Sequence, residues 1–176
     1  GQVRMYVCGP TVYDVGHLGH GRSAVVFDMI RRFLQFQGHT VTFVSNVTDI
    51  DDKMIDRARE RGMSVAELAA EIIPLYRRDF DALRILPPTR QSRATEFVGP
   101  MLELLKRLDA AGATYTLSDG VYFDVSRFAR YGALSGQRLD ELQAGARVEV
   151  NSEKRSPMDF VLWKFKKEGE PFWPSP

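Results

Sequence analysis

The alternation of hydrophobic and polar residues at the start of the chain predicts a parallel βαβ unit. Apolar side chains at positions 3, 5 and 7 alternate with Arg4 and Tyr6, which is typical of a strand. From about Gly19 to Gln37, apolar residues recur on one face of a predicted helix: Val26, Met29, Ile30, Phe33 and Leu34. Residues 39–44 are rich in β-branched and aromatic side chains, which predicts a second strand. Two strands joined through a helix lie parallel, with a right-handed crossover.

Three further helices are expected before residue 112. One runs from about Asp52 to Gly62, and a capping box of Ser64 with Glu67 begins another that lasts to about Leu83. Pro74 inside that helix predicts a kink or a break. After the boundary at Pro87-Pro88, residues 95–111 form a helix with Leu102, Leu105 and Leu108 inward, Pro100 in its first turns and Gly112 as its stop.

The pattern changes after Gly112. Residues 115–117 and 121–123 flank Ser118-Asp119-Gly120, which predicts a hairpin. A short helical piece is expected at about 139–144, a strand at 160–163 and a loop at 169–176. The aromatic tail from Pro171 reaches no cap, so we expect the chain to be part of a longer protein.

Composition narrows the class of protein. The net charge of +1 gives no broad electrostatic attraction for nucleic acid, and no run of about 18 apolar residues exists to span a membrane. The first five residues lack the pattern of a signal peptide. The single cysteine, Cys8, suits a reducing compartment. We therefore expect a cytoplasmic protein with no membrane association.

Two of the three histidines stand in His17-Leu18-Gly19-His20, between the first predicted strand and helix. In a βαβ unit this loop lies at the carboxyl ends of the strands, where the following helix points its free N–H groups and favours phosphate. Two imidazoles there would stabilise charge that builds up during nucleotidyl transfer. The alternative is a surface loop with two solvated histidines. Neither a GxGxxG nor a P-loop pattern is present.

The residues alone give weaker indications for metals. A lone cysteine is typically a small buried hydrophobe, and Cys8 with the histidines makes no recognised zinc spacing. Asp49, Asp51 and Asp52 would either hold magnesium or cap the next helix. Asn46 and Thr48 are expected to face the same crevice as the histidines.

Several sequence blocks resemble cysteinyl-tRNA synthetases. The first is Tyr6-Val7-Cys8-Gly9-Pro10-Thr11-Val12-Tyr13-Asp14, followed by His17-Leu18-Gly19-His20, which is similar to the HIGH signature with leucine in place of isoleucine. The others are Asn46–Lys53, Leu142–Val148, Pro157–Lys164 and Trp173–Pro176. HIGH alone indicates only class I synthetases, whereas these blocks in this order are specific and cover essentially the whole chain.

The resemblance implies an α/β fold, the Rossmann-like parallel sheet of a class I synthetase catalytic domain. Residues 1–112 would be its first half and 113–176 the start of its connective insertion. It implies ATP-dependent activation of cysteine to cysteinyl-adenylate and transfer to tRNA(Cys). The partners would be ATP with magnesium, cysteine and tRNA(Cys), and the enzyme is expected to be a monomer.

The resemblance also implies roles for single residues. His17 and His20 would be catalytic, and Pro10, Thr11, His17, Gly19 and His20 would bind ATP. Gly9 and Thr48 would bind cysteine. Cys8 would be the first zinc ligand rather than a buried hydrophobe, and the substrate thiolate would coordinate that zinc, which disfavours serine.

In the family, three further zinc ligands, the KMSKS loop and the tRNA-binding helical domain follow the point where this chain ends. We therefore expect the 176-residue chain alone to be inactive and to hold no stoichiometric zinc. Two alternatives remain at this stage: a cysteine–glucosaminyl-inositol ligase of mycothiol synthesis, which has similar motifs, and a non-catalytic nucleotide-binding fragment.

Overall fold

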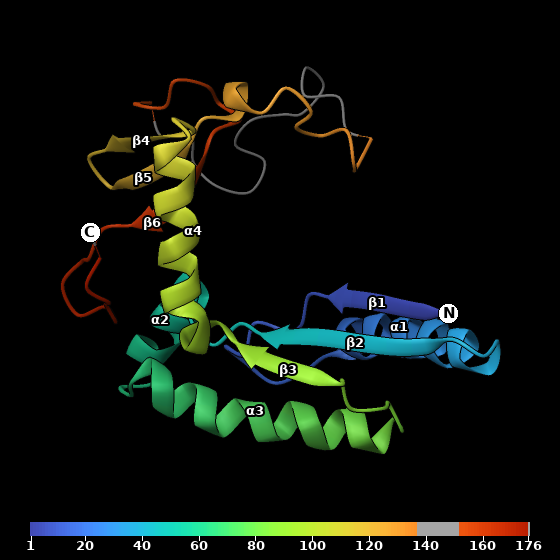
Figure 1. Cartoon of the computed structure of the whole chain (residues 1–176). Helices are drawn as coiled ribbons and strands as arrows, with labels where there is room; N and C mark the ends of the chain where they lie inside the picture. Colours follow the sequence, from blue (N-terminus) through green and yellow to red (C-terminus); the bar gives the residue numbers. More distant parts are fainter. Residues whose placement is uncertain (137–151, 176) are drawn as a thin grey trace. The chain divides into compact units, whose positions relative to one another are not determined.

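The computed structural model describes residues 1–136 and 152–175 (Figure 1). The chain forms two compact units, Gly1–Val98 and Gly99–Pro176. The last long helix ends in the turn that leads into the second unit's sheet. There Thr114 Oγ1 donates a hydrogen bond to Asp109. The helical piece expected at 139–144 lies outside the described residues.

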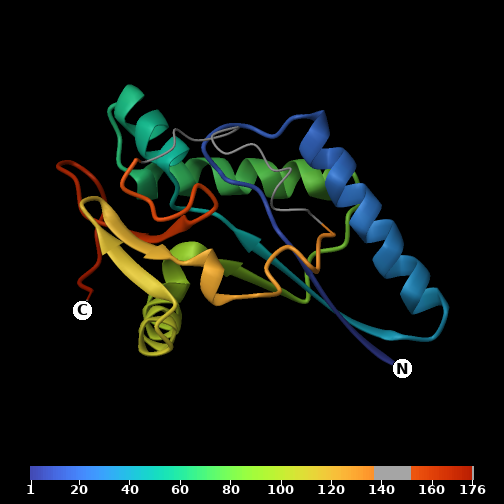
Figure 2. The same ribbon diagram turned by 90° about the horizontal axis from the view of Figure 1, so that it is seen from above.

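The first unit contains a parallel three-stranded sheet. Its elements are β1 (Gln2–Val7), α1 (Leu18–Phe36), β2 (Thr40–Val47), α2 (Asp52–Glu60), α3 (Val65–Ala82), β3 (Arg90–Arg93) and η1 (Ala94–Phe97). The strand order is β1-β2-β3, and Val3 is paired with Val41. Figure 2 shows α1 and α3 running along the sheet. The predicted parallel βαβ unit is therefore confirmed.

The strand β3 was not predicted. Its sequence, Arg-Gln-Ser-Arg, has no apolar residue and so no hydrophobic alternation. It nevertheless pairs in parallel with β2, from Val44 opposite Arg90 to Val47 opposite Arg93. The segment is a strand because it pairs with β2, which is distant in sequence, and not because of its own residue pattern.

The helix ends in the first unit follow the predicted signals. Ser64 and Glu67 form the capping box of α3, and Asp51 caps α2 by accepting a 3.0 Å hydrogen bond from the Lys53 amide. Gly38, after α1, has a φ of +82°, a conformation that glycine adopts without steric cost. Pro74 lies inside α3 without ending it. None of the helices in the described ranges is both long and apolar enough to cross a membrane.

The main core of the first unit lies between α2, α3 and the end of β2. Met54, Leu68 and Val12 are fully buried there, with Ile72 and Tyr76 of α3 beside them.

The apolar stripe of α1, in contrast, is largely exposed within the described structure. Met29 and Phe33 are 64% and 58% exposed within the described structure, and Asp28 is the buried residue of that helix. Asp28 accepts hydrogen bonds from Arg32 and from the Leu86 amide.

The second unit contains an antiparallel sheet. Its elements are α4 (Val98–Ala110), β4 (Thr114–Leu117), β5 (Gly120–Phe123), η2 (Val125–Arg127) and β6 (Phe160–Lys164), and the strand order is β4-β5-β6. Leu117 pairs with Gly120 across the Ser118-Asp119 turn, so the predicted hairpin is confirmed. The helix expected over 95–111 is a 3-10 turn, η1, followed by α4.

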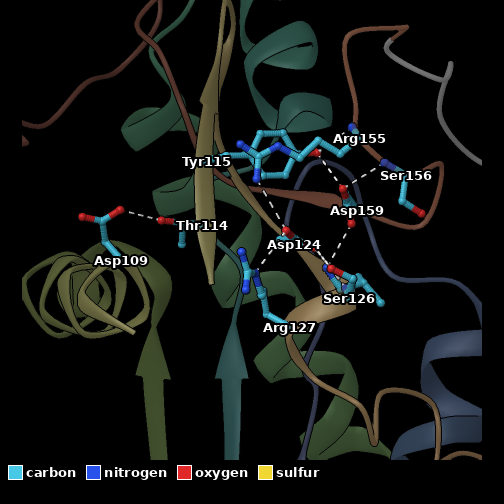
Figure 3. Close-up of polar contacts among 10 residues, drawn as sticks. Asp109, Thr114, Tyr115, Asp124, Ser126, Arg127, Arg155, Ser156 and Asp159 are labelled. Carbon is cyan, nitrogen blue, oxygen red and sulfur yellow. Dashed lines mark hydrogen bonds and ion pairs between the residues drawn. The ribbon is translucent and has the colours of Figure 1, made fainter. Parts of the chain in front are cut away.

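A buried carboxylate holds the second unit together (Figure 3). Asp159 is 2% exposed and accepts hydrogen bonds from the Tyr115 hydroxyl, the Val125 amide and the Ser156 amide. These donors come from β4, η2 and the segment before β6. A buried carboxylate is tolerated when its oxygens are satisfied in this way.

Candidate functional site

A cavity of about 720 Å³ lies in the first unit, beside the loop that follows β1. Its lining includes many polar side chains, among them those of Cys8, Thr11, His17, His20, Lys53 and Tyr76. They come from the loop after β1 and from α1, α2 and α3. The cavity therefore lies where a parallel sheet usually binds its ligands, at the carboxyl ends of the strands.

Both histidines of the His-Leu-Gly-His segment cap α1. His17 is the N-cap residue, and its Nδ1 accepts a 3.1 Å hydrogen bond from the Gly19 amide. His20 Nδ1 accepts a 3.2 Å hydrogen bond from the His17 amide, which completes a capping box. The two ring centroids are 3.9 Å apart. The pair is thus an ordered part of the helix end, in which the His17 side chain is exposed and His20 is half-buried.

Gly19 makes this arrangement sterically feasible. A Cβ atom at Gly19 would lie 2.9 Å from Cε1 of His17 and 3.0 Å from its Nδ1, closer than side chains normally pack. The imidazole of His17 therefore folds back over a helix turn that has no side chain at that position.

The electrostatics of the helix end favour an anion. No acidic residue stands in the first turn of α1, and the free N–H groups of a helix N-terminus carry partial positive charge. Lys53 also lines the cavity. Burial, and then the neighbouring His17, lower the pKa of His20, so its ring is neutral near pH 7. A neutral imidazole still donates one hydrogen bond.

The loop after β1 is tied to the end of β2. The Gly9 amide donates to Asn46 Oδ1 at 2.8 Å, and Asn46 Nδ2 donates to Thr48 Oγ1 at 3.1 Å. The Thr48 amide donates to the Pro10 carbonyl, and Thr11 pairs with Thr48 as an isolated parallel bridge. The backbone at Pro10 and Thr11 is therefore fixed.

Asn46 and Thr48 are not among the residues that line the cavity, although the sequence placed them in the crevice of the histidines. Their neighbours Ser45 and Val47 line it instead. Successive side chains of a strand point to opposite faces, so Asn46 faces away from the side of β2 on which Ser45 and Val47 line the cavity. Thr48 is therefore connected to the loop through its backbone.

Cys8 is exposed and lines the cavity, so the interpretation of Cys8 as a buried hydrophobe is wrong. Among residues 1–136 and 152–175, no three side chains of His, Cys, Asp or Glu converge as a metal site. The described residues therefore offer zinc one thiol donor and do not complete a site. The aspartates after β2 have structural contacts instead: Asp51 caps α2, and Asp49 accepts two hydrogen bonds from Thr95.

Sequence reasoning missed several residues of the cavity, among them Tyr76 and Lys53. Tyr76 occupies a core position on the apolar face of α3, and such a tyrosine is normally interpreted as packing. Lys53 stands in the first turn of α2 and forms a cation–π contact with Tyr13. No local pattern marks either residue as part of a site, because both reach the cavity only through the tertiary fold.

Fold and site together define an α/β domain whose cavity lies at the carboxyl ends of a parallel sheet and beside a helix N-terminus, an arrangement common in nucleotide-binding proteins. Residues 1–176 match the family model described as tRNA synthetases class I (C) catalytic domain, and the chain belongs to this family.

Relatives named cysteine–tRNA ligase are similar over the whole chain. The protein of Clostridioides difficile (strain 630) is 50% identical over 176 residues, which are 100% of this chain and 38% of that protein. The protein of Shigella boydii serotype 4 (strain Sb227) is 54% identical over 177 residues, covering 100% of this chain and 40% of that protein. The chain thus spans about two fifths of the length of these relatives.

A solved structure shares the fold. The crystal structure of Mycobacterium tuberculosis methionyl-tRNA synthetase bound by methionyl-adenylate matches with a TM-score of 0.58 and 26% identity. The match covers 65% of this chain and 22% of that chain.

Proposed function

We propose that the full-length protein is a cysteine–tRNA ligase, which activates cysteine with ATP and transfers it to tRNA(Cys). The observation that carries this proposal is the pair of capping histidines beside the cavity, in a chain 50% or more identical over its whole length to proteins of that name. In the first step, a carboxylate oxygen of cysteine attacks the α-phosphorus of ATP. The bond to the β-phosphate oxygen breaks, and pyrophosphate leaves as cysteinyl-adenylate forms.

His17 and His20 are the proposed catalytic residues. Each Nδ1 accepts a backbone N–H, so each neutral ring carries its proton on Nε2. Those Nε2–H groups would donate to the α-phosphate oxygens, where negative charge accumulates in the transition state. The N-terminus of α1 adds the partial charge of its own amides, and Gly19, Pro10 and Thr11 would complete the ATP site.

Gly9 and Thr48 would hold the amino acid. The N–H of Gly9 is donated to Asn46, which leaves its carbonyl oxygen as the group able to meet the ammonium of cysteine. Thr48 Oγ1 accepts from Asn46 and retains its own proton as a donor.

Cys8 would supply one zinc ligand, and the remaining ligands would come from the part of the protein that this chain does not include. The exposed position of the thiol at the cavity supports this role. A single thiolate does not hold zinc against water, so the metal depends on those additional ligands.

Three assays on the full-length protein separate this function from its alternatives. Cysteine-dependent exchange of pyrophosphate into ATP reports adenylate formation, and its absence would indicate a non-catalytic nucleotide-binding protein. Transfer of cysteine to tRNA(Cys) identifies the synthetase. Transfer to glucosaminyl-inositol without charging of tRNA(Cys) would identify the ligase of mycothiol synthesis.

A further inference from the structure

Tyr76 of α3 lines the same cavity as the histidine pair and contacts His20. Its hydroxyl oxygen lies 3.4 Å from His20 Nδ1, and its ring meets the His20 ring edge-on at a centroid distance of 5.4 Å. Tyr76 is 4% exposed, whereas His20 is half-buried. The contact joins residues of two helices that are 56 positions apart in the chain.

The hydrogen bonds around His20 determine which ring nitrogen carries the proton. A backbone N–H only donates, and the His17 amide points at His20 Nδ1 from 3.2 Å. Nδ1 must therefore present its lone pair, so a neutral ring carries its proton on Nε2. Because Nδ1 has no proton to give, the Tyr76 hydroxyl is the donor in the contact between the two side chains.

The charge states of both groups agree with this assignment. Burial, followed by the nearby Tyr13, Asp14 and Asp79, raises the pKa of Tyr76, so the hydroxyl keeps its proton. Burial and His17 lower the pKa of His20, so Nδ1 keeps its lone pair at neutral pH. The His17 amide and the Tyr76 hydroxyl share the single lone pair of Nδ1, and a protonated His20 would lose both contacts.

Packing alone explains the ring of Tyr76 but not its hydroxyl. The ring lies in the main core and contacts Phe80 edge-on at 6.0 Å, and a phenylalanine would make the same contacts. The hydroxyl is the group that meets His20, the N3 residue of the α1 capping box.

We propose that Tyr76 is a positioning residue. Its hydroxyl donates a hydrogen bond to His20 Nδ1, which orients the imidazole so that Nε2–H is the group that meets the phosphate. The proposal rests on the proposed function for the rate effect, but the hydrogen bond itself is independent of it. Such a hydrogen bond orients the imidazole before the ligand arrives, which is how a preorganised donor gains its effect.

The tautomer of His20 tests the proposal directly. In full-length protein with ¹⁵N-labelled histidine, long-range ¹H–¹⁵N spectra distinguish a protonated ring nitrogen from an unprotonated one. The His20→Gln variant identifies the His20 signals by their loss. We expect Nδ1 to be unprotonated and Nε2 to be protonated. An Nδ1–H tautomer in the unmutated protein would overturn the proposal without any change at Tyr76.

The Tyr76→Phe variant then isolates the hydroxyl, because it keeps the ring and its packing. We expect the ¹⁵N shifts of His20 Nδ1 and Nε2 to move toward each other as the Nδ1–H tautomer gains population. The kcat of ATP–pyrophosphate exchange should fall about three- to tenfold, the range for one neutral hydrogen bond. KM for ATP should change by less than about twofold.

Tyr131→Phe is the matched control. Tyr131 belongs to the second unit, where its ring stacks on Phe160, and its change should leave both the His20 shifts and the exchange rate unaltered. Unchanged shifts and unchanged kcat in Tyr76→Phe would show that Tyr76 only packs. If His20→Gln exchanges at the normal rate while the shifts still respond to Tyr76→Phe, the catalytic role of His20 fails but the hydrogen bond stands. If the unmutated full-length protein shows no cysteine-dependent exchange while the shifts still respond, the proposed function fails and the hydrogen bond stands.

Discussion

Gly9 lies directly against the backbone of Asn46. Its amide donates a 2.8 Å hydrogen bond to Asn46 Oδ1, and a Cβ atom at Gly9 would overlap the carbonyl oxygen of Asn46 and lie 2.8 Å from its carbonyl carbon. The obstacle is backbone of the central strand β2, which does not move aside as a flexible side chain does. The absence of a side chain at Gly9 is therefore what lets the loop after β1 reach its position beside the cavity.

Gly9→Ala should consequently destabilise the protein and displace this loop. We expect a loss of about 2 kcal/mol or more in the free energy of unfolding, because the clash is with backbone. Urea denaturation of the full-length protein measures it, and ATP–pyrophosphate exchange should fall with it. Gly99→Ala is the control, since a Cβ there meets nothing within 4 Å and the position is helical. Equal stability of the two variants would contradict the proposed steric role of Gly9.

His20→Ala in the full-length protein should slow ATP–pyrophosphate exchange about a hundredfold or more, far beyond its effect on cysteine binding. One transition-state hydrogen-bond donor typically contributes that much to the rate. Exchange measured over a range of cysteine concentrations gives both the rate at saturation and the KM for cysteine.

His20→Gln separates catalysis from capping. Glutamine at this helix position still accepts the amide hydrogen of the N-cap residue, so the capping box of α1 is retained. We expect His20→Gln to melt close to the unmutated protein while its exchange rate stays low. Normal exchange kinetics in both variants would remove His20 from the mechanism.

The pH dependence of His20 follows from its environment. Burial and His17 lower its pKa below the usual 6.5, so the unfolded chain takes up a proton at a higher pH than the folded one. His20 therefore contributes stability that is fully present above about pH 6.5 and decreases as the pH falls toward the folded pKa. An NMR titration of the ring should place His20 below 6.5, and His20→Gln should weaken the pH dependence of unfolding. A titration midpoint at or above 6.5 would contradict the assignment of a neutral ring.

Asp159 should be the most sensitive polar residue of the second unit. Asp159→Asn replaces one acceptor oxygen by an NH₂ group that faces donors, and we expect a loss of about 3 kcal/mol in the free energy of unfolding. Hydrogen exchange should accelerate first at the amides of Val125 and Ser156, which donate to this carboxylate. Asp109→Asn, at an exposed aspartate that accepts from Thr114, should cost less than about 1 kcal/mol. Unaltered exchange at Val125 and Ser156 would count against the central role of Asp159.

Cys8 should be metal-bound in the full-length protein and exposed to reagents in the 176-residue chain. Elemental analysis should find about one zinc per full-length molecule, lost in Cys8→Ser, and no stoichiometric zinc on the chain alone. Thiol reagents should modify Cys8 rapidly only in the latter. A full equivalent of zinc on the 176-residue chain, retained after mild chelation and lost in Cys8→Ser, would show that the ligand set is misassigned.

The sequence by itself determined the features that depend on near neighbours. The capping box at Ser64, the stops at Gly38 and Gly112 and the hairpin at Ser118-Asp119 all rest on residues within a few positions of one another. The His-Leu-Gly-His segment was located for the same reason, because a strand, a loop and a helix in succession place it at the carboxyl end of the sheet.

Only the tertiary structure decided the features that depend on distant partners. The polar segment Arg90–Arg93 becomes a strand because β2 offers it hydrogen-bonding groups, and the apolar stripe of α1 is left largely exposed within the described residues. Tyr76 meets His20 because α3 packs near α1, although its sequence position indicates only a core residue. Periodicity reports which side of an element is apolar. Which residues then come together depends on how the elements pack against one another, and the sequence of a single element does not specify that packing.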